Sequence, residues 1–228
     1  MELYEALMTT RSMRRLTDDP PVTDEEIEHC LRAAAQAPSG GNVQPYHLVV
    51  ITDPEARTVM ADLYLRGWRR YRPALLAALP PFPSPEAAAS FRRGLDLSEH
   101  LAEHLADTPS VLFCLASYEN TLTDDEGPLD IGTLHASVFP AVQSFLLAAR
   151  GLGLGTTLTT VFRVHNDEVR DAFGLPPHLD PVALVPIGRP QGRFGVAPRK
   201  PIEKITHWNR YGDRRPFVTA PWHAPAPA

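Results

Sequence analysis

The sequence contains only two cysteines, Cys30 and Cys114, and both stand in apolar surroundings without CxxC spacing. This scarcity argues against a disulfide framework or a cysteine-based metal site, and we expect two reduced thiols in the core. Reduced thiols favour a cytoplasmic location. A secretory signal is not expected either, because Glu2 and Glu5 stand where such a signal carries positive charge.

Long apolar runs are also missing, so no membrane span is predicted. Lys and Arg number 22 against 27 Asp and Glu, which gives a net charge of −5 and makes non-specific nucleic-acid binding a poor prediction. The chain has no P-loop, Rossmann glycine fingerprint or GxSxG elbow. His100 and His104 have zincin spacing in "EHLAEH", but the glutamate of HExxH is misplaced, so we expect no metal site.

What remains is a 228-residue chain with 43% hydrophobic residues, enough for one large globular domain of the α+β class. Buried strands are predicted at 47–52, 110–116 and 182–188. Helices are predicted at 2–8, from Thr23 to Pro38 with a Thr23–Glu26 capping box, after Pro54 with Val59, Met60, Leu63 and Tyr64 on one face, at 86–106, at 134–150, and from an Asn166 cap to Gly174.

The segment 64–106 resembles an insertion between two core strands. It combines the basic and aromatic "RGWRRYRP" with the proline-rich "PPFPSP". Because of its prolines, we do not expect this segment to pack against the core sheet. We expect a lid or a partner-contacting arm. An acidic loop is predicted at 121–130. The domain is expected to cover 1–213, with an extended or disordered tail at 214–228.

Two segments look suited to a ligand. "TTRSMRRL" (9–16) places three arginines around Ser12, and arginine binds phosphate oxygens with two parallel donors. "APSGGNVQPY" (37–46) turns through two glycines and delivers Asn42 and Gln44 just before a strand. The alternatives are solvated arginines at a helix end for the first segment, and an ordinary helix-to-strand loop for the second.

Together with "GLGLGTTLTTV" (151–161) and "RKPIEKI" (199–205), these segments resemble the FMN-dependent nitroreductase superfamily in order and spacing. Its members carry R-S-x-R near the N-terminus, A-P-S-x-x-N-x-Q-P-W after the next helix, a glycine-rich turn into a threonine-bearing strand, and a late basic motif. Tyr46 replaces the usual Trp. The start and the "HWN" at 207–209 look closest to an actinobacterial-type branch. The resemblance implies a central, mostly antiparallel sheet flanked by helices, with an inserted helical lid or arm.

Carried over by residue, the resemblance gives FMN contacts to each ligand segment. Arg11, Ser12 and Arg199 fall where the family binds the phosphate, and Arg14 falls beside the flavin N1 and O2. The remaining expected cofactor-binding residues are Met13, Pro38, Ser39, Gly40, Asn42, Gln44, Leu158, Thr159 and Thr160, with the last three near N5. Thr10 replaces an arginine of the commoner motif, so Arg15 is a candidate to supply that contact.

The implied activity is hydride transfer from NADH or NADPH through flavin N5 to a nitroaromatic, quinone or related acceptor, in a ping-pong cycle. Flavin N5 would do the chemistry and no protein acid or base is required. Tyr64, Trp68 and Tyr71 are candidate substrate contacts. The resemblance also implies a homodimer with FMN at its interface, which the apolar 134–150 helix would suit. The open alternatives are a specialised reaction, namely reductive dehalogenation, enone reduction or flavin cleavage, and a flavin-binding protein without turnover.

Overall fold

The computed structural model describes residues 1–117, 123–125, 127–128 and 135–219. The helices are α1 (Leu3–Thr9), α2 (Asp24–Ala35), α3 (Pro54–Ala78), α4 (Pro85–Glu103), α5 (His135–Gly151) and α6 (Asn166–Ala172), with 3-10 helices at η1 (Gly40–Asn42), η2 (Leu105–Asp107), η3 (Val161–His165) and η4 (Ile202–Lys204). The strands are β1 (Leu16–Thr17), β2 (Tyr46–Ile51), β3 (Ser110–Ser117), β4 (Thr123–Asp124), β5 (Gly127–Pro128), β6 (Gly155–Thr156) and β7 (Leu179–Pro190). Half of the predicted 121–130 loop lies outside the described residues, and its described part contains β4 and β5.

The chain divides into two compact units, Ser12–Arg193 and a smaller one built from Met1–Arg11 and Phe194–Ala228. The larger unit contains the main sheet, with strand order β1-β7-β3-β2 and β6 also paired with β7, and every pairing in it is antiparallel. The α+β class with a flanked antiparallel sheet is therefore confirmed. The predicted boundary at 213 stays a prediction.

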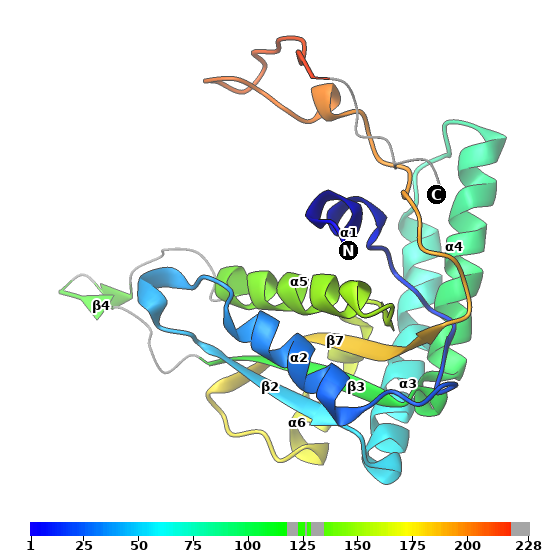
Figure 1. Ribbon diagram of the computed structural model, residues 1–228, viewed down its shortest axis with the longest axis vertical. Coiled ribbons are helices and arrows are strands. Elements are labelled where there is room, and N and C mark those ends of the chain that lie inside the picture. The colour runs from blue at the N-terminus through cyan, green and yellow to red at the C-terminus, as the bar shows by residue number, and fades with distance from the viewer. Residues whose placement is uncertain (118–122, 126, 129–134, 220–228) are drawn as a thin grey trace. The chain divides into compact units, whose positions relative to one another are not determined.

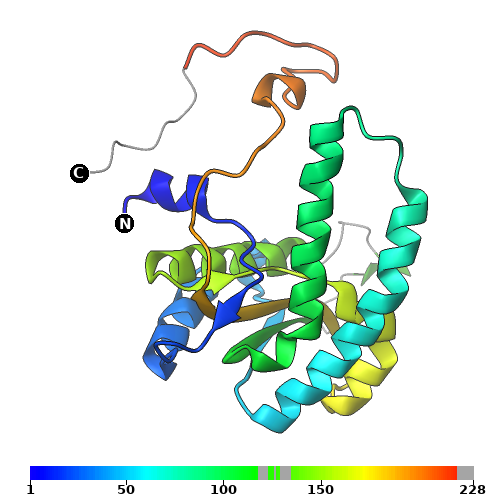
Figure 2. The ribbon, with the colours of Figure 1, turned by 90° about the vertical axis from the view of Figure 1, so that its right-hand side faces the viewer.

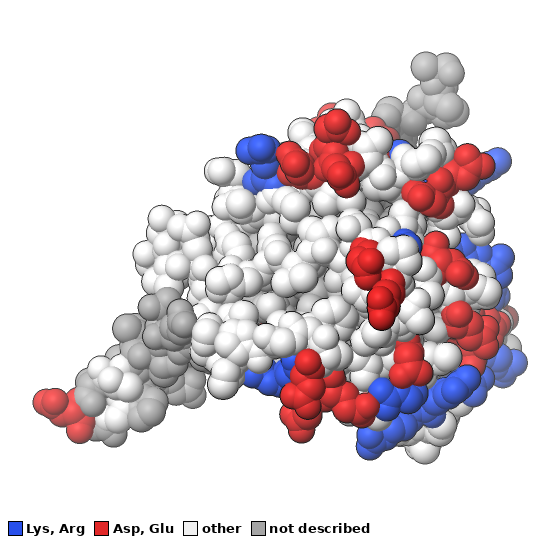
Figure 3. Space-filling view, turned by 90° about the horizontal axis from the view of Figure 1, so that it is seen from below, with Lys and Arg blue, Asp and Glu red and all other residues white. Residues whose placement is uncertain are grey.

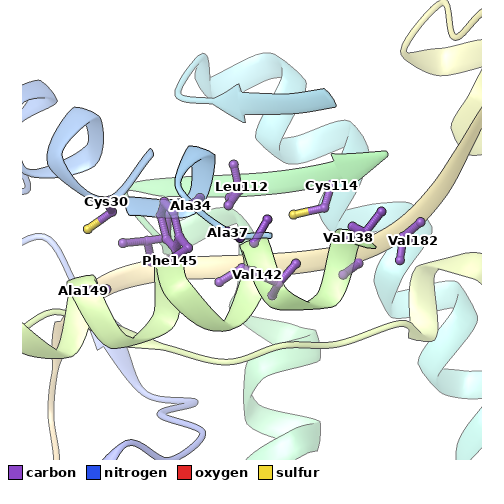
Figure 4. Packing of buried hydrophobic residues seen from close by; sticks show 14 of the residues in the cluster. Cys30, Ala34, Ala37, Leu112, Cys114, Val138, Val142, Phe145, Ala149 and Val182 are labelled. Atoms are coloured by element: carbon purple, nitrogen blue, oxygen red, sulfur yellow. The ribbon is translucent and has the colours of Figure 1, made fainter. Parts of the chain in front are cut away.

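Side chains of β3 alternate between two cores, which explains why this strand reads as a continuous apolar run. Leu112, Cys114 and Ala116 pack with α2 and α5, whereas Val111, Phe113 and Leu115 pack with α3, α4 and η3. Figure 4 shows the first core, where labelled side chains of α2, β3 and α5 point into one layer. Figure 1 shows α2 and α5 beside the sheet, with α3 and α4 at its other side.

Strand β2 corrects one prediction, because it is not buried throughout. Its residues alternate in burial, and Val49 remains 36% exposed. The reason is its place in the sheet: β2 is the edge strand, and its alternate residues Tyr46, Leu48 and Val50 face the α2–α5 core. A short apolar run thus did not distinguish an edge strand from a central one.

The insertion also differs from expectation. Helix α3 runs unbroken from the core through Pro73, and α4 pairs with it as a second long helix, as Figure 2 shows. Tyr64, Trp68 and Leu101 belong to the core shared with β3, so the expectation that this segment avoids the core was wrong. Four of its prolines fall in the 79–84 connection or at the start of α4, where proline is compatible with the backbone.

Helix ends and faces follow the sequence in most places. The Thr23–Glu26 capping box is present, and Gly174 ends the α6 segment with a φ of 58°. Asn166 is not a cap: it is already helical because η3 leads directly into α6, and its Oδ1 is buried without a partner among the described residues. Val59 is 40% exposed, because the buried face of α3 starts one residue later, at Met60.

Helix α5 buries its apolar face within the chain. Val138, Val142 and Phe145 are fully enclosed between α2 and the sheet, whereas Phe139 is 40% exposed. Its apolarity is therefore explained without a second subunit, and it no longer supports a dimer on its own. Pro140 lies inside the helix, close to its first turn as expected.

Surface charge is unevenly distributed on the face seen from below Figure 1. Figure 3 shows Lys and Arg gathered beside Asp and Glu on one side of that face, next to a broad area without charged side chains. Among the described residues Arg66 contacts both Asp62 and Glu168, at 2.8 and 2.7 Å.

None of the described helices is long and apolar enough to cross a membrane.

Candidate functional site

The candidate site is a cavity of about 690 Å³ in the larger unit. Three walls enclose it: the inner faces of α3 and α4, and the segment from Thr157 to Val164. Its lining residues are Arg14, Tyr64, Trp68, Tyr71, Leu75, Phe91, Gly94, Leu95, Ser98, Leu101, Thr157, Leu158, Thr159, Thr160, Val161, Arg163 and Val164. A cavity of this size and character suits a small organic ligand.

Arg14 is positioned by the backbone on either side of it. The amide of Met13 donates to the Thr156 carbonyl at 2.8 Å, and Gln191 donates to the Arg15 carbonyl at 3.0 Å. Gly155 allows this close packing, because a Cβ at that position would lie 2.8 Å from Leu16 and 3.1 Å from Met13. The glycine-rich turn therefore has a steric role in placing the arginine beside the cavity.

Tyr64 and Thr159 form the polar contact of the cavity wall, with 3.1 Å between their hydroxyl oxygens. Burial raises the pKa of Tyr64, while the hydrogen bond to Thr159 and the charge of Arg14 act in the opposite direction. The tyrosine is thus a neutral hydroxyl near neutral pH. Among the described residues the buried Nε1 of Trp68 has no hydrogen-bond partner.

Arg163 supplies the second cation of the wall. Its guanidinium donates to Asp180 at 3.0 Å, and His135 Nε2 lies 3.1 Å from the same carboxylate oxygen. This ion pair holds the guanidinium of Arg163 beside the first residues of β7. Sequence reasoning missed Arg163, Phe91, Gly94 and Ser98, since only their place on a helix face or 3-10 turn brings them to the cavity.

The predicted site residues fall into separate groups. Arg14 and Leu158–Thr160 line the cavity together with Tyr64, Trp68 and Tyr71, and Met13 is hydrogen-bonded beside them. Ser12 precedes them in the same unit. Arg11 and Arg199 belong to the smaller unit, so their role at a phosphate stays a prediction.

The loop 38–44 forms a third group, away from the cavity lining. Gly40 donates to Ser137 Oγ at 3.4 Å, in the first turn of α5, whereas Thr156 beside Met13 follows the last turn of α5. A 17-residue helix is about 25 Å long, so the two groups lie near opposite ends of α5 (Figure 1).

This loop has a constrained backbone. Gly41, Asn42 and Gln44 all have left-handed φ values, of 57°, 56° and 52°. Ser39 Oγ accepts from the Gln44 amide at 2.9 Å, and the Gln44 side chain donates to the Asn42 carbonyl at 3.2 Å. Asn42 and Gln44 therefore brace the loop, and left-handed non-glycine residues of this kind concentrate at functional sites.

The other chemical candidates are accounted for structurally. Cys30 and Cys114 are free and buried, as predicted. Burial raises the pKa of each thiol to about 12, and Glu26 adds to the effect at Cys30. His100 and His104 lie with their rings 4.4 Å apart, and the part of the chain that the structure describes holds no cluster of three metal-ligating side chains.

Residues 7–189 match the sequence model of the Nitroreductase family. The chain is 26% identical to "FMN reductase [NAD(P)H]" of Bacillus subtilis, over 92% of this chain and 74% of that protein. It is 26% identical to "4-nitrobenzoate reductase" of Nocardioides sp., over 90% and 89%. Its fold is similar to that of iodotyrosine deiodinase bound to FMN and 3-iodo-L-tyrosine, with a TM-score of 0.69 at 20% identity, over 92% of this chain and 100% of that one.

Proposed function

Because this chain belongs to the nitroreductase family, we propose that it is an FMN-dependent oxidoreductase. It takes electrons from NADH or NADPH and passes them to a small electron-poor acceptor such as a nitroaromatic compound or a quinone. Donor and acceptor use the same cavity in turn, in a ping-pong cycle. The names of the similar proteins, FMN reductase and 4-nitrobenzoate reductase, support this activity.

The donor set at the cavity fits the ring of FMN. When bound, FMN supplies hydride transfer through its N5 atom. Arg14 would place a fixed cation beside the part of the ring that becomes negative on reduction, and Leu158, Thr159 and Thr160 would lie against its central edge. Arg11, Ser12 and Arg199 would hold the phosphate by charge-assisted hydrogen bonds.

The cavity beside Arg14 is the observation that carries the proposal. A protein that only stores flavin has no need of space beyond the ring, whereas an enzyme must admit a second molecule. The cavity of about 690 Å³ would hold the ring and, beside it, a planar acceptor against the aromatic side chains of Trp68, Tyr71 and Phe91. The same space accommodates the specialised reactions of the alternative, so the acceptor assay decides between them.

The proposal includes a homodimer that completes the FMN site. In one chain, loop 38–44 and Arg14 lie near opposite ends of α5, so the loop of one copy would serve the cavity of the other. Strand β2 is a sheet edge without a further strand partner among the described residues, a feature that proteins usually cover.

Two finer assignments belong to the proposal. The TTR start and the "HWN" at 207–209 support an actinobacterial-type branch of the family. The two free, buried thiols support a cytoplasmic location.

The test is direct. The purified full chain should be yellow and should release FMN on denaturation. It should then oxidise NADH or NADPH rapidly when a nitroaromatic compound or a quinone is present as acceptor. Without such an acceptor, only slow oxidation with oxygen as acceptor is expected. Protein that neither contains nor takes up FMN would contradict the assignment. FMN-loaded protein that leaves both nicotinamides unoxidised would instead favour the flavin-binding alternative.

A further inference from the structure

Each long helix of the cavity carries one interior glycine, Gly67 in α3 and Gly94 in α4. An interior glycine costs a helix about 0.5–1 kcal/mol relative to alanine. Gly67 has a steric reason, because a Cβ there would lie 2.7 Å from the Val161 carbonyl oxygen. Helix α3 could not pack on η3 with any larger residue at this position.

Gly94 has no such reason within the chain. A Cβ built on it would meet nothing within 4 Å among the described residues outside its own helix turn and chain neighbours. Its φ is not in the left-handed region, and it is the tenth residue of the 19 in α4, far from either end. Neither close packing, backbone strain nor helix termination therefore requires glycine here.

The open space beside Gly94 is the cavity. Phe91 and Ser98 flank it one turn away on the same face of α4, and Tyr71 and Leu75 line the cavity from α3. Ser98 Oγ donates to the Gly94 carbonyl at 2.9 Å, so its proton is used inside the helix. The wall at Gly94 is consequently bare helix backbone between Phe91 and Ser98, with space for an aromatic ring to approach it closely.

We propose that Gly94 is a specificity-determining residue of the acceptor site. Its missing side chain makes room for the second ring of a fused aromatic acceptor, such as a naphthoquinone, which lies against the α4 backbone. This inference rests on the proposed oxidoreductase function, because it names the class of acceptor for that cavity. A single-ring acceptor leaves the space at Gly94 unfilled and does not depend on it.

The test compares two acceptors in the FMN-loaded full chain: menadione, with two fused rings, and 1,4-benzoquinone, with one. Gly94→Ala should raise the KM for menadione about tenfold, and Gly94→Leu should raise it further or abolish turnover. The KM for benzoquinone should rise much less than the KM for menadione, and FMN content measures whether cofactor binding is retained. Equilibrium dialysis of menadione against the oxidised protein should show the same loss of affinity without turnover.

Thermal unfolding supplies a readout in the opposite direction. Gly94→Ala should raise the midpoint by about 2–4 °C, because alanine is the better helix former. Gly67→Ala should lower it, because Val161 has to move. Ser90→Ala and Ser90→Leu are the matched controls, since Ser90 is an exposed residue of α4 outside the cavity lining.

Three outcomes would overturn the inference: unchanged menadione kinetics and binding in both Gly94 variants, an equal rise of KM for both quinones, or the same change in the Ser90 controls. A parent protein that lacks FMN or nicotinamide oxidation would contradict the proposed function itself. The parent assay therefore separates the two failures.

Discussion

At the residue scale, the predicted flavin contacts divide between two kinds of arginine. Arg14 lines the cavity and is assigned to the part of the flavin ring that would gain negative charge on reduction, whereas Arg199 is assigned to a phosphate that is charged throughout. Only an interaction that strengthens during reduction changes the redox equilibrium. The two arginines should therefore differ in effect although their side chains are identical.

Arg14→Ala should lower the reduction potential of bound FMN and slow its reduction by NAD(P)H more than it weakens FMN binding. Arg199→Ala should mainly weaken FMN binding, by about 1.5–3 kcal/mol for one charged hydrogen bond. The checks are a redox titration against a reference dye and FMN release during dialysis. Equal shifts of potential in both variants would refute the division of roles.

The two buried thiols give a pH prediction. Each thiol has a pKa raised to about 12 in the folded chain against 9.0 for an exposed cysteine. Since the folded form keeps its protons longer than the unfolded form, this contribution to stability is complete below pH 9 and is lost progressively between pH 9 and about 12.

Between pH 9 and pH 10 the thiol of Cys114 alone should remove about 1 kcal/mol from the free energy of unfolding. Cys114→Ala will be less stable at every pH because it leaves a cavity, but its stability should fall less steeply over this interval. Urea unfolding at pH 8, 9 and 10 measures both slopes. Parallel curves for the parent and the variant would show that the thiol does not titrate as stated.

At the element scale, the first turn of α2 is fixed from two sides. Thr23 and Glu26 form the capping box, and Glu26 also pairs with Arg189 of β7 at 2.7 Å. Arg189 lowers the pKa of Glu26, so this contribution is present at neutral pH and is lost as the pH falls below the usual range of the carboxyl group. The cap thus fixes the helix that leads into loop 38–44.

Thr23→Ala should lower the free energy of unfolding by about 1 kcal/mol, because the Glu26 amide loses its acceptor. Thr58→Ala is the control: Thr58 is an exposed threonine of α3 whose hydroxyl only donates back to the Pro54 carbonyl. Chemical denaturation at pH 7 compares the two. If Thr58→Ala lowered the free energy of unfolding as much as Thr23→Ala, the lost stability would not come from the cap.

Local signals in the sequence identified most of these elements. The sequence predicted three of them correctly: the capping box, the continuous apolar run of β3 and the glycine that ends α6. Each depends only on residues that are close in the sequence. Long-range context decided the rest. An edge position exposes one face of β2, and an adjoining 3-10 helix makes Asn166 helical. The sequence could not identify Gly94 as a site residue, since its proposed role depends on the cavity that α4 forms with α3 and the 157–164 segment.

Long-range packing also changes the prediction of a lid or partner-contacting arm at 64–106. Trp68 belongs to the core, so Trp68→Ala would destabilise the fold as well as alter the cavity. Arg69 is exposed on α3, so a substitution there can test whether the arm selects acceptors without disturbing the core. Whether the α3–α4 pair moves during turnover stays a prediction.

At the scale of the whole molecule, the site residues named by the sequence do not form one site in one chain. Motif order along the sequence is compatible with a single-chain site and with a shared one, because order carries no distance. The structure sets loop 38–44 near the first turn of α5 and Arg14 near the last. In the proposed dimer, a second copy would bring its loop to the cavity, and C2 symmetry would complete two such sites.

Mixed dimers test the shared site. Arg14→Ala removes one of the two cations of the cavity wall, and Gly40→Trp places a bulky side chain on the loop, where a Cβ meets no described atom within 4 Å. Each variant alone should have little NAD(P)H oxidation and twice the 25.2 kDa chain mass in sedimentation. If the two are unfolded together and refolded, half of the dimers are mixed and one of the two sites in each is intact, so activity should return to about a quarter of the parent value. If each site lies within one chain, no mixed dimer contains an intact site, and the mixture can only average its two parents.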